Sequence, residues 1–210
     1  MVPNGGTSLP MAYWGTSVEY SLHCLVWLVH EPSTPISSRE LAQMQGVSVS
    51  FVAKLLPRLE RAGIVHSAGG ISGGYRLRRP AREITVLAVI DAVEGRKRLF
   101  DCQNIRSRCV LFAGNPPSWA TDGVCRVHAV MIRAESMLRA ELSRTTLADL
   151  AAGANWPPSF AENAGRWFSE RSSDREKARL TAIRISRRPE ASSMPEAGRK
   201  TGPKPRPGGS

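Results

Sequence analysis

The sequence predicts a mainly α-helical fold with one small β-hairpin. Three observations support this prediction: segments with apolar residues at helical spacing, a glycine-rich stretch between two short strand-like segments, and a long amphipathic segment in the second half of the chain. The chain has 210 residues, which permits one good-sized core or a smaller domain with attached helices and tails.

The first predicted helix covers residues 17–29. Its apolar residues recur at helical spacing, at Val18, Leu22, Leu25, Val26 and Val29. Prolines at positions 32 and 35 end this helix, because two prolines this close do not fit inside one. Residues 1–12 are rich in glycine, proline and serine, and we expect them to be unstructured.

Residues 37–47 predict a short helix followed by a tight turn. Ser37 and Glu40 have the spacing of a capping box, in which each side chain accepts a hydrogen bond from the backbone N–H of the other residue. The helix should continue to Met44, and residues 45–47 should form the turn.

A second helix follows directly, with Ser48 as its predicted N-cap and its end at Ala62 and Gly63. Its apolar residues also recur at helical spacing, at Phe51, Val52, Leu55, Leu56 and Leu59. Pro57 lies inside this helix and should bend it or lower its stability.

Two short strands are predicted next, at residues 64–67 and 75–78, on either side of a glycine-rich hairpin tip. The apolar run 84–90 then leads into a helix that ends at residues 94–95. After a loop that contains cysteines, a long amphipathic helix is predicted over residues 125–143. Its apolar residues are Val127, Val130, Met131, Ala134, Leu138 and Leu142. Residues 146–150 form a further turn or short helix.

The order of these elements is that of a winged helix-turn-helix, whose second helix enters the major groove of DNA while the hairpin lies along the backbone. Hydroxyls and cations on these elements suit contacts to phosphates and base edges. The candidate DNA-binding residues are Ser38, Ser48, Ser50, Lys54, Arg58 and Arg61 on the helices, and Ser72, Tyr75, Arg76, Arg78 and Arg79 in the wing. The alternative is a solvated basic face on an ordinary three-helix fold.

The charge balance also favours a polyanionic partner. The chain has 29 Lys+Arg against 18 Asp+Glu, a formal net charge of +11, and nucleic acid is the usual partner of such a protein. The alternative is that the excess charge belongs to the tail. Beyond residue 154 the composition changes to proline, serine, arginine and glycine, so we expect residues 153–210 to be basic and largely disordered.

Two classes of protein are excluded by the sequence. The apolar run at residues 24–29 is too short to span a membrane, and no signal-peptide pattern precedes it, so we expect a cytoplasmic protein without a membrane partner. The chain has no nucleophile–base constellation, phosphate-binding loop or metal-hydrolase motif, so we do not expect an enzyme.

Three of the four cysteines belong to the loop between two predicted helices. Cys102, Cys109 and Cys125 have the spacing C-x6-C-x15-C. Thiolates suit zinc or an iron–sulfur cluster, but this spacing lacks the paired C-x2-C elements of a zinc knuckle. The alternatives are free surface thiols or one disulfide. Cys24 lies among apolar residues, and we expect it to be a buried thiol.

Several blocks of the chain, in order between residues 15 and 152, resemble the Rrf2 family of bacterial regulators. The blocks are residues 19–23, 48–56, 59–63, 73–77 and 83–95. The resemblance implies a homodimer that is joined through the long helix and binds a roughly palindromic operator in double-stranded DNA. One position departs from the family: Gly69 stands where the wing usually carries an arginine for the minor groove.

The resemblance also gives the cysteines a role. Many members of the family carry three cysteines in this loop and bind a [2Fe–2S] or [4Fe–4S] cluster, and a redox-sensing [2Fe–2S] subset is similar to this chain around residues 18–24. The resemblance to that subset implies four ligands: Glu19 and His23 of one protomer, and Cys102 and Cys125 of the other. Cys109 is then a spare thiol. The two ligands on the first helix are four residues apart and therefore share one helical face.

Three alternatives remain open at this stage. All three loop cysteines could ligate the metal, with His128 as the fourth ligand; His23 could be a partly buried packing residue; or the chain could be a repressor without a cluster that responds through thiols or a small ligand. The predicted organisation is therefore a winged helix-turn-helix at residues 13–95, a cluster loop at 96–124, a dimerisation helix region at 125–152 and a basic tail at 153–210.

Overall fold

The computed structural model describes residues 13–30, 34–70 and 73–186. Its elements, in chain order, are α1 (Thr16–Val29), α2 (Ser38–Gln45), α3 (Val49–Arg61), β1 (Val65–Ala68), β2 (Gly74–Leu77), η1 (Ala81–Glu83), α4 (Val86–Glu94), η2 (Ile105–Arg108), η3 (Val110–Phe112), α5 (Ser118–Thr121), α6 (Arg126–Arg144), α7 (Leu147–Ala152) and α8 (Pro158–Ser186). The expectations for residues 1–12, for Ser72 and for the tail after residue 186 lie outside the described residues.

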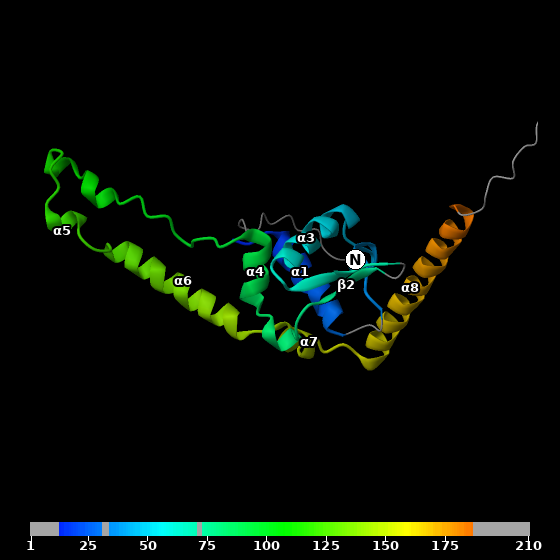
Figure 1. The fold of residues 1–210 in the computed structure, drawn as a ribbon. Coiled ribbons are helices and arrows are strands. Elements are labelled where there is room, and N and C mark those ends of the chain that lie inside the picture. The colour runs from blue at the N-terminus through cyan, green and yellow to red at the C-terminus, as the bar shows by residue number, and fades with distance from the viewer. Residues whose placement is uncertain (1–12, 31–33, 71–72, 187–210) are drawn as a thin grey trace, which may run out of the picture.

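The hydrophobic core lies where α1, α3 and α4 meet, with α2, the hairpin and α7 around it (Figure 1). Helix α7 is tied to the start of α4 by backbone hydrogen bonds from Leu147 N to Ile84 O (2.9 Å) and from Val86 N to Thr145 O (2.9 Å). The largest fully buried side chains are Leu25, Ile36, Leu41, Leu56, Leu59, Ile64, Ile84 and Leu147. The prediction of a mainly α fold with one small hairpin is confirmed.

The turn between α2 and α3 forms as the sequence predicts. Ser37 N donates to Glu40 Oε2 at 2.7 Å, and Glu40 N donates to Ser37 Oγ at 3.2 Å, so the capping box is present. Gly46 ends α2 with a φ of 65°, a left-handed conformation that glycine adopts without strain.

Helix α3 differs from the prediction in its cap. Ser48 occupies the N-cap position, but its hydroxyl accepts no backbone hydrogen bond there and lies 2.8 Å from Ser50 Oγ. The helix continues through Pro57 to Arg61. Pro57 is exposed, so its ring meets solvent and not the core.

The wing is an antiparallel pair of strands in which Val65 lies opposite Leu77. Its second strand also pairs with Ile36, two residues before α2, because Ile36 N donates to Tyr75 O (3.2 Å) and Tyr75 N donates to Ile36 O (2.8 Å). Gly74 permits this close approach, since a Cβ at that position would lie 2.7 Å from the carbonyl carbon of Ile36. The base of the wing is therefore joined directly to the helix-turn-helix.

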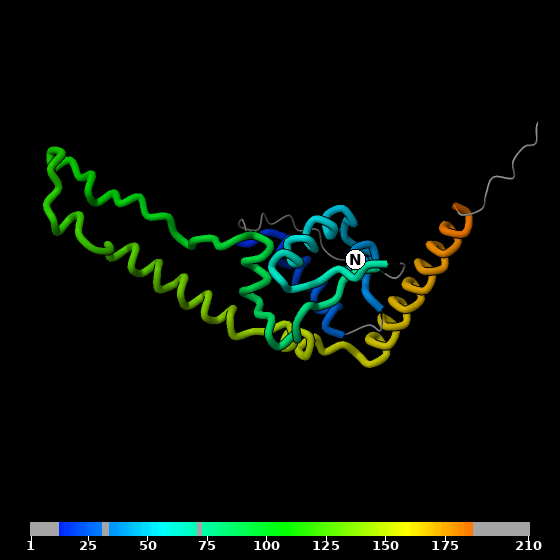
Figure 2. Tube along the Cα trace, in the orientation of Figure 1, coloured from blue at the N-terminus to red at the C-terminus, as the bar shows by residue number. Residues whose placement is uncertain are grey.

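Residues 96–144 form an arm that projects away from the rest of the molecule (Figures 1 and 2). The outgoing half contains η2, η3 and α5, and the returning half is α6. Helix α6 buries none of its residues in this chain. It begins one residue after Cys125, close to the predicted start. None of the helices in residues 13–30, 34–70 and 73–186 is long and apolar enough to cross a membrane.

The expectation of a largely disordered tail is wrong for residues 158–186, which form α8. The physical reason is a line of small and apolar residues at four-residue spacing, because Ala164, Phe168 and Ser172 are all buried. Trp27 of α1 completes the contact. Its ring stacks on Trp156 at a centroid distance of 4.4 Å and meets Phe168 edge-on at 5.7 Å.

Candidate DNA-binding surface and metal-ligand residues

The first turns of α3 present polar side chains to solvent. Ser48, Ser50 and Lys54 are exposed, while the opposite face of the helix is buried in the core through Val52, Leu55, Leu56 and Leu59. Ser38, the first residue of α2, is half-buried. The burial pattern therefore leaves the predicted contact face at the start of α3 accessible to a ligand.

The two arginines at the end of α3 have partners within the chain. Arg58 Nη1 donates to the carbonyl oxygen of Val93 at 2.7 Å, near the C-terminus of α4. Arg61 Nε donates to Pro57 O at 3.3 Å. These contacts give Arg58 a structural role in joining α3 to α4, which the sequence did not indicate.

In the wing, Tyr75 and Arg76 are half-buried, whereas Arg78 and Arg79 are exposed. Burial raises the pKa of Tyr75, and the nearby carboxylate of Glu60 adds to this effect. Glu60 itself accepts hydrogen bonds from the hydroxyl (2.6 Å) and the backbone N–H (2.8 Å) of Ser67, which lower the pKa of that carboxyl. Glu60 therefore fixes the first wing strand to the end of α3.

Glu19 and His23, the predicted ligands on α1, are both exposed and lie one helical turn apart. Neither side chain has a hydrogen bond or an ion pair with another described residue. Within one chain His23 is therefore not a packing residue, and its packing against a partner helix stays an open alternative. The neighbouring Cys24 is 1% exposed and accepts a hydrogen bond from Gln45 Nε2 (3.1 Å), which confirms the prediction of a buried thiol. Burial raises its pKa from 9.0 to about 11.

The other predicted ligands belong to the arm. Cys102 and Cys125 are half-buried, Cys109 is exposed, and all three are free thiols. Cys125 is the N-cap of α6, and its Sγ accepts a hydrogen bond from His128 N at 3.3 Å. This position at the positive end of a helix suits an anionic ligand.

A single chain does not assemble a metal site from these residues. Within the part of the chain that the structure describes, no group of three or more histidine, cysteine, aspartate or glutamate residues lies close enough to hold a metal ion. In Figure 1, α1 lies in the body, and the arm that contains the three cysteines projects away from it. The three loop cysteines and His128 therefore do not form a ligand set within one chain.

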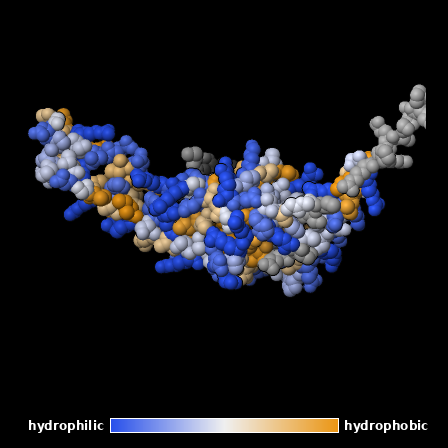
Figure 3. All heavy atoms as spheres, viewed as in Figure 1, coloured by the Kyte–Doolittle hydropathy of each residue, from blue (hydrophilic) through white to orange (hydrophobic). Residues whose placement is uncertain are grey.

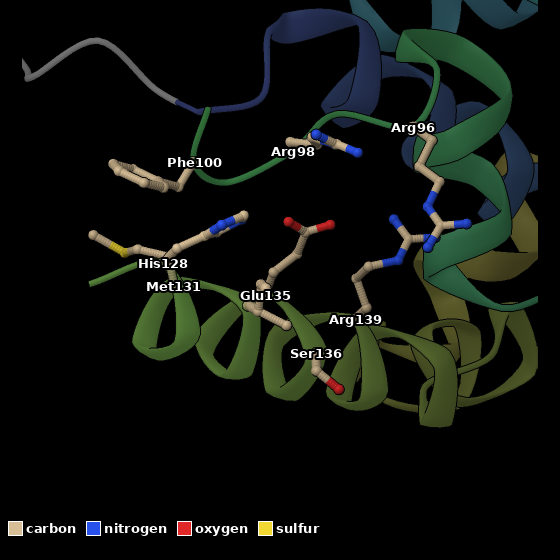
Figure 4. A pocket seen from close by; sticks show the side chains of 9 residues that line it. Arg96, Arg98, Phe100, His128, Met131, Glu135, Ser136 and Arg139 are labelled. Atoms are coloured by element: carbon tan, nitrogen blue, oxygen red, sulfur yellow. The ribbon is translucent and has the colours of Figure 1, made fainter. Parts of the chain in front are cut away.

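A cleft of about 770 Å³ lies between α6 and the extended segment 96–100 (Figure 4). Glu135 spans it, because its Oε2 accepts a hydrogen bond from Leu99 N at 3.1 Å. Arg139 pairs with Asp91 of α4 at 2.7 Å, and this hydrogen bond raises the pKa of the guanidinium. The lining residues are Arg96, Arg98, Phe100, His128, Met131, Ile132, Glu135, Ser136 and Arg139. These contacts fix the base of the arm to the body.

Several large apolar side chains are exposed on the arm, and Figure 3 shows orange patches there among hydrophilic residues. The exposed members are Ile105, Val110, Leu111, Trp119, Val124, Val127, Val130, Ile132 and Met137. Exposed apolar side chains in this number make the arm a candidate interaction surface.

The comparison with known proteins decides the family. Residues 15–153 match the model of the Rrf2 family, described as iron-dependent transcriptional regulators. The chain belongs to the Rrf2 family. It is a transcription regulator with a winged-helix DNA-binding domain, as the sequence resemblance predicted.

Individual relatives of this Rrf2-family chain agree with the assignment. The protein Rrf2 of Nitratidesulfovibrio vulgaris is 31% identical over 135 residues, which cover 64% of this chain and 83% of the relative. CymR, the global cysteine regulator of B. subtilis, matches with a TM-score of 0.55 at 25% identity, over 69% of this chain and 100% of CymR. IscR of T. potens matches with a TM-score of 0.52 at 26% identity, over 69% and 90% of the two chains.

Sequence reasoning missed one group of functional interest, on α8. Arg175 Nη1 is paired with Glu40 of α2, with both side chains largely buried, and Arg175 Nη2 donates to Pro35 O at 3.0 Å. The available signal was the spacing of Ala164, Phe168 and Ser172. This helix lies beyond the residues that match the family.

Proposed function

We propose that this Rrf2-family regulator binds its DNA operator as a homodimer, and that an iron–sulfur cluster held between the two subunits controls operator affinity. The observation that carries the proposal is the separation of the candidate ligands within one chain. Two stand exposed on α1, two stand on a projecting arm, and the described residues of one chain bring no metal-binding group together.

Dimerisation through the arm follows from its exposed surface. Helix α6 has 19 residues, is amphipathic, and buries none of them within the chain. Burial of apolar surface against a second copy would supply the packing that this helix lacks. The exposed side chains of Val127, Val130 and Met137 are the expected centre of such an interface.

The residues present fit an iron–sulfur cluster by the chemistry of the donor set. Cysteine thiolates and imidazole are suitable ligands for iron, and in known clusters histidine can replace cysteine. Cys102, Cys125, Glu19 and His23 together offer two sulfurs, one carboxylate and one imidazole, and all four are free of disulfides and ion pairs within the described residues. The resemblance of residues 18–24 to the redox-sensing subset favours [2Fe–2S] over [4Fe–4S].

The coupling to DNA would pass through α1. A bound cluster supplies a centre whose charge changes on reduction or loss. Next to the two α1 ligands lie residues that touch the reading helices: the ring of Tyr20 packs edge-on against Phe51 of α3 at 5.3 Å, and Cys24 accepts a hydrogen bond from Gln45 of α2. A shift of α1 therefore moves the helix-turn-helix, and a dimer must keep its two α3 helices at the spacing of the half-sites.

A second candidate function is supported by the exposure of Cys109. In a cluster-free regulator, this thiol and its neighbours on the arm would respond to oxidants directly. The likeness to CymR, a regulator named for cysteine, is compatible with this alternative.

The test is the visible absorption and circular dichroism spectrum of the full chain purified without oxygen, with iron and sulfide assayed. We expect the bands of a [2Fe–2S] centre in the wild type and their loss in His23→Ala and Cys102→Ala. The matched controls are His30→Ala, on the exposed end of the same helix, and Cys109→Ala, in the same loop; both should retain iron. A colourless protein without iron, even after reconstitution, would favour the thiol mechanism.

A further inference from the structure

Helix α8 is an addition to the Rrf2 domain that lies against its DNA-binding part. The family match ends at residue 153, and α8 covers Pro158–Ser186. In Figure 1 this helix rises past the end of the β1–β2 hairpin. Its contacts with α2 and with the wing tip place it beside the elements that bind DNA.

The middle of α8 is held firmly on the helix-turn-helix. The Arg175–Glu40 ion pair leaves only 14% and 7% of the two side chains exposed. Arg175 Nη2 also donates to Ser172 Oγ (3.2 Å) and to Pro35 O (3.0 Å). Glu40 belongs to the capping box of α2, so the position of α8 is fixed relative to the helices that read DNA.

One turn further along, α8 reaches the wing tip. Arg179 Nη1 donates to Gly70 O at 2.7 Å. The same nitrogen lies 3.7 Å from where a Cβ on Gly73 would be. The described part of the tip consists of Ala68, Gly69, Gly70 and Gly73. These residues carry no charged side chain, so α8 places a guanidinium at a tip that has no cation of its own among them.

The charges of α8 are unevenly distributed along its length. Residues 158–176 contain four acids and three arginines, whereas residues 177–186 contain Lys177, Arg179 and Arg184 and no acid. These three cations are exposed. The basic part of the helix is thus the part that reaches and passes the wing.

We propose that the C-terminal third of α8 is an additional DNA-contacting element, in which Arg179 contacts the phosphate backbone beside the wing. In a winged helix-turn-helix the hairpin lies along the DNA backbone, so a cation fixed at its tip is placed near phosphates. This inference rests on the DNA-binding part of the proposed function and is independent of the cluster.

The experiment measures DNA affinity as a function of salt. Duplexes are first selected from a random-sequence pool by the full-length wild type, and one selected duplex is then titrated by fluorescence anisotropy between low and high salt. The test variant is Arg179→Gln, which keeps a polar N–H donor on the side chain and removes the positive charge. The control is Arg166→Gln, which removes one exposed arginine from the same helix far from the wing.

Each phosphate contact contributes about 0.9 to the magnitude of the slope of log association constant against log salt concentration. Loss of one contact per subunit should therefore reduce that magnitude by about 2 for a dimer. It should also weaken binding on the order of 10-fold at low salt. Arg166→Gln should leave the slope unchanged. Arg179→Lys, which keeps the positive charge, should retain most of the wild-type slope. Circular dichroism melting checks that each variant is folded.

Two results would overturn the inference while leaving the regulator assignment intact. In the first, the slopes for Arg179→Gln and Arg166→Gln are equal. In the second, Arg179→Gln binds more weakly with the wild-type slope, which would mean that Arg179 only supports the wing. If the wild type selects no duplex, the DNA-binding function itself fails, and the inference fails with it. That outcome is recognised from the wild type alone.

Discussion

The body and the arm of this regulator are stabilised in different ways. The body, residues 13–95 with α7 and α8, buries its apolar residues within one chain, and Leu25, Leu41, Leu56 and Leu59 are fully enclosed. The arm, residues 96–144, leaves most of its large apolar residues exposed, and α6 buries none of its own. The body therefore packs its core within one chain, whereas the arm leaves an apolar surface that the proposed dimer would cover.

The largest expected effect of a substitution is on the stability of the body. Leu56→Ala removes a fully buried side chain from α3 and should lower the free energy of unfolding by about 4 kcal/mol. Urea unfolding followed by circular dichroism measures this loss, which should not depend on protein concentration. Leu180→Ala, at an exposed leucine of α8, is the control and should change stability little. Equal effects of the two variants would contradict the assigned core.

The next largest effect is on the attachment of α8 to the helix-turn-helix. Arg175→Ala leaves Glu40 without its buried partner, and loss of one member of such a pair costs about 3 kcal/mol. Hydrogen exchange of residues 158–186 should therefore speed up on the order of 100-fold. Arg166→Ala should leave the exchange of this helix nearly unchanged. Unaltered exchange in Arg175→Ala would show that the ion pair does not hold α8.

A charge on the apolar face of α6 should weaken dimerisation through the arm. Val130→Glu on α6 should raise the dissociation constant of the dimer by on the order of 100-fold, because a carboxylate would be buried in the proposed interface. Sedimentation equilibrium measures this constant. Ile185→Glu, at an exposed isoleucine of α8, is the matched control. A dimer whose dissociation constant is unchanged by Val130→Glu would place the interface elsewhere.

The smallest effect is a difference in thiol reactivity between the two regions. The raised pKa of Cys24, about 11, and its burial keep it protonated and inaccessible near pH 8, whereas Cys109 of the arm is exposed. Iodoacetamide labelling of the protein without cluster, followed by peptide mass spectrometry, should modify Cys109 at least about 10-fold faster than Cys24. Comparable rates would mean that α1 opens readily.

Sequence periodicity predicted α1 to α4, the two wing strands and α7 to within about two residues. Apolar residues such as Val52, Leu56 and Leu59 find their partners in the same chain, so a helical pattern is enough to place them. The capping box at Ser37 and Glu40 and the buried Cys24 were predicted for the same reason: each depends on local spacing or local composition.

The remaining features depend on contacts that local patterns do not show. Helix α8 has a composition typical of a tail, and its fold depends on Trp27 and Glu40, more than 100 residues earlier in the chain. Arg58 was expected to contact DNA from its charge alone, but its guanidinium meets the carbonyl of Val93. The candidate ligands lie on two separate parts of the chain, so no local sequence pattern brings them together. They were therefore inferred from the resemblance to the family.

The central claim, that each cluster is held by α1 of one subunit and the arm of the other, is tested most directly by a mixed dimer. One chain carries Glu19→Ala and His23→Ala, the other carries Cys102→Ala and Cys125→Ala, and the two are co-expressed with different tags and purified in tandem without oxygen. Each variant alone should lack iron. The account predicts that the mixed dimer restores one of two symmetric sites and therefore about half of the wild-type iron and absorbance. A mixed dimer without iron, beside a wild type that contains it, would contradict ligation across the subunits.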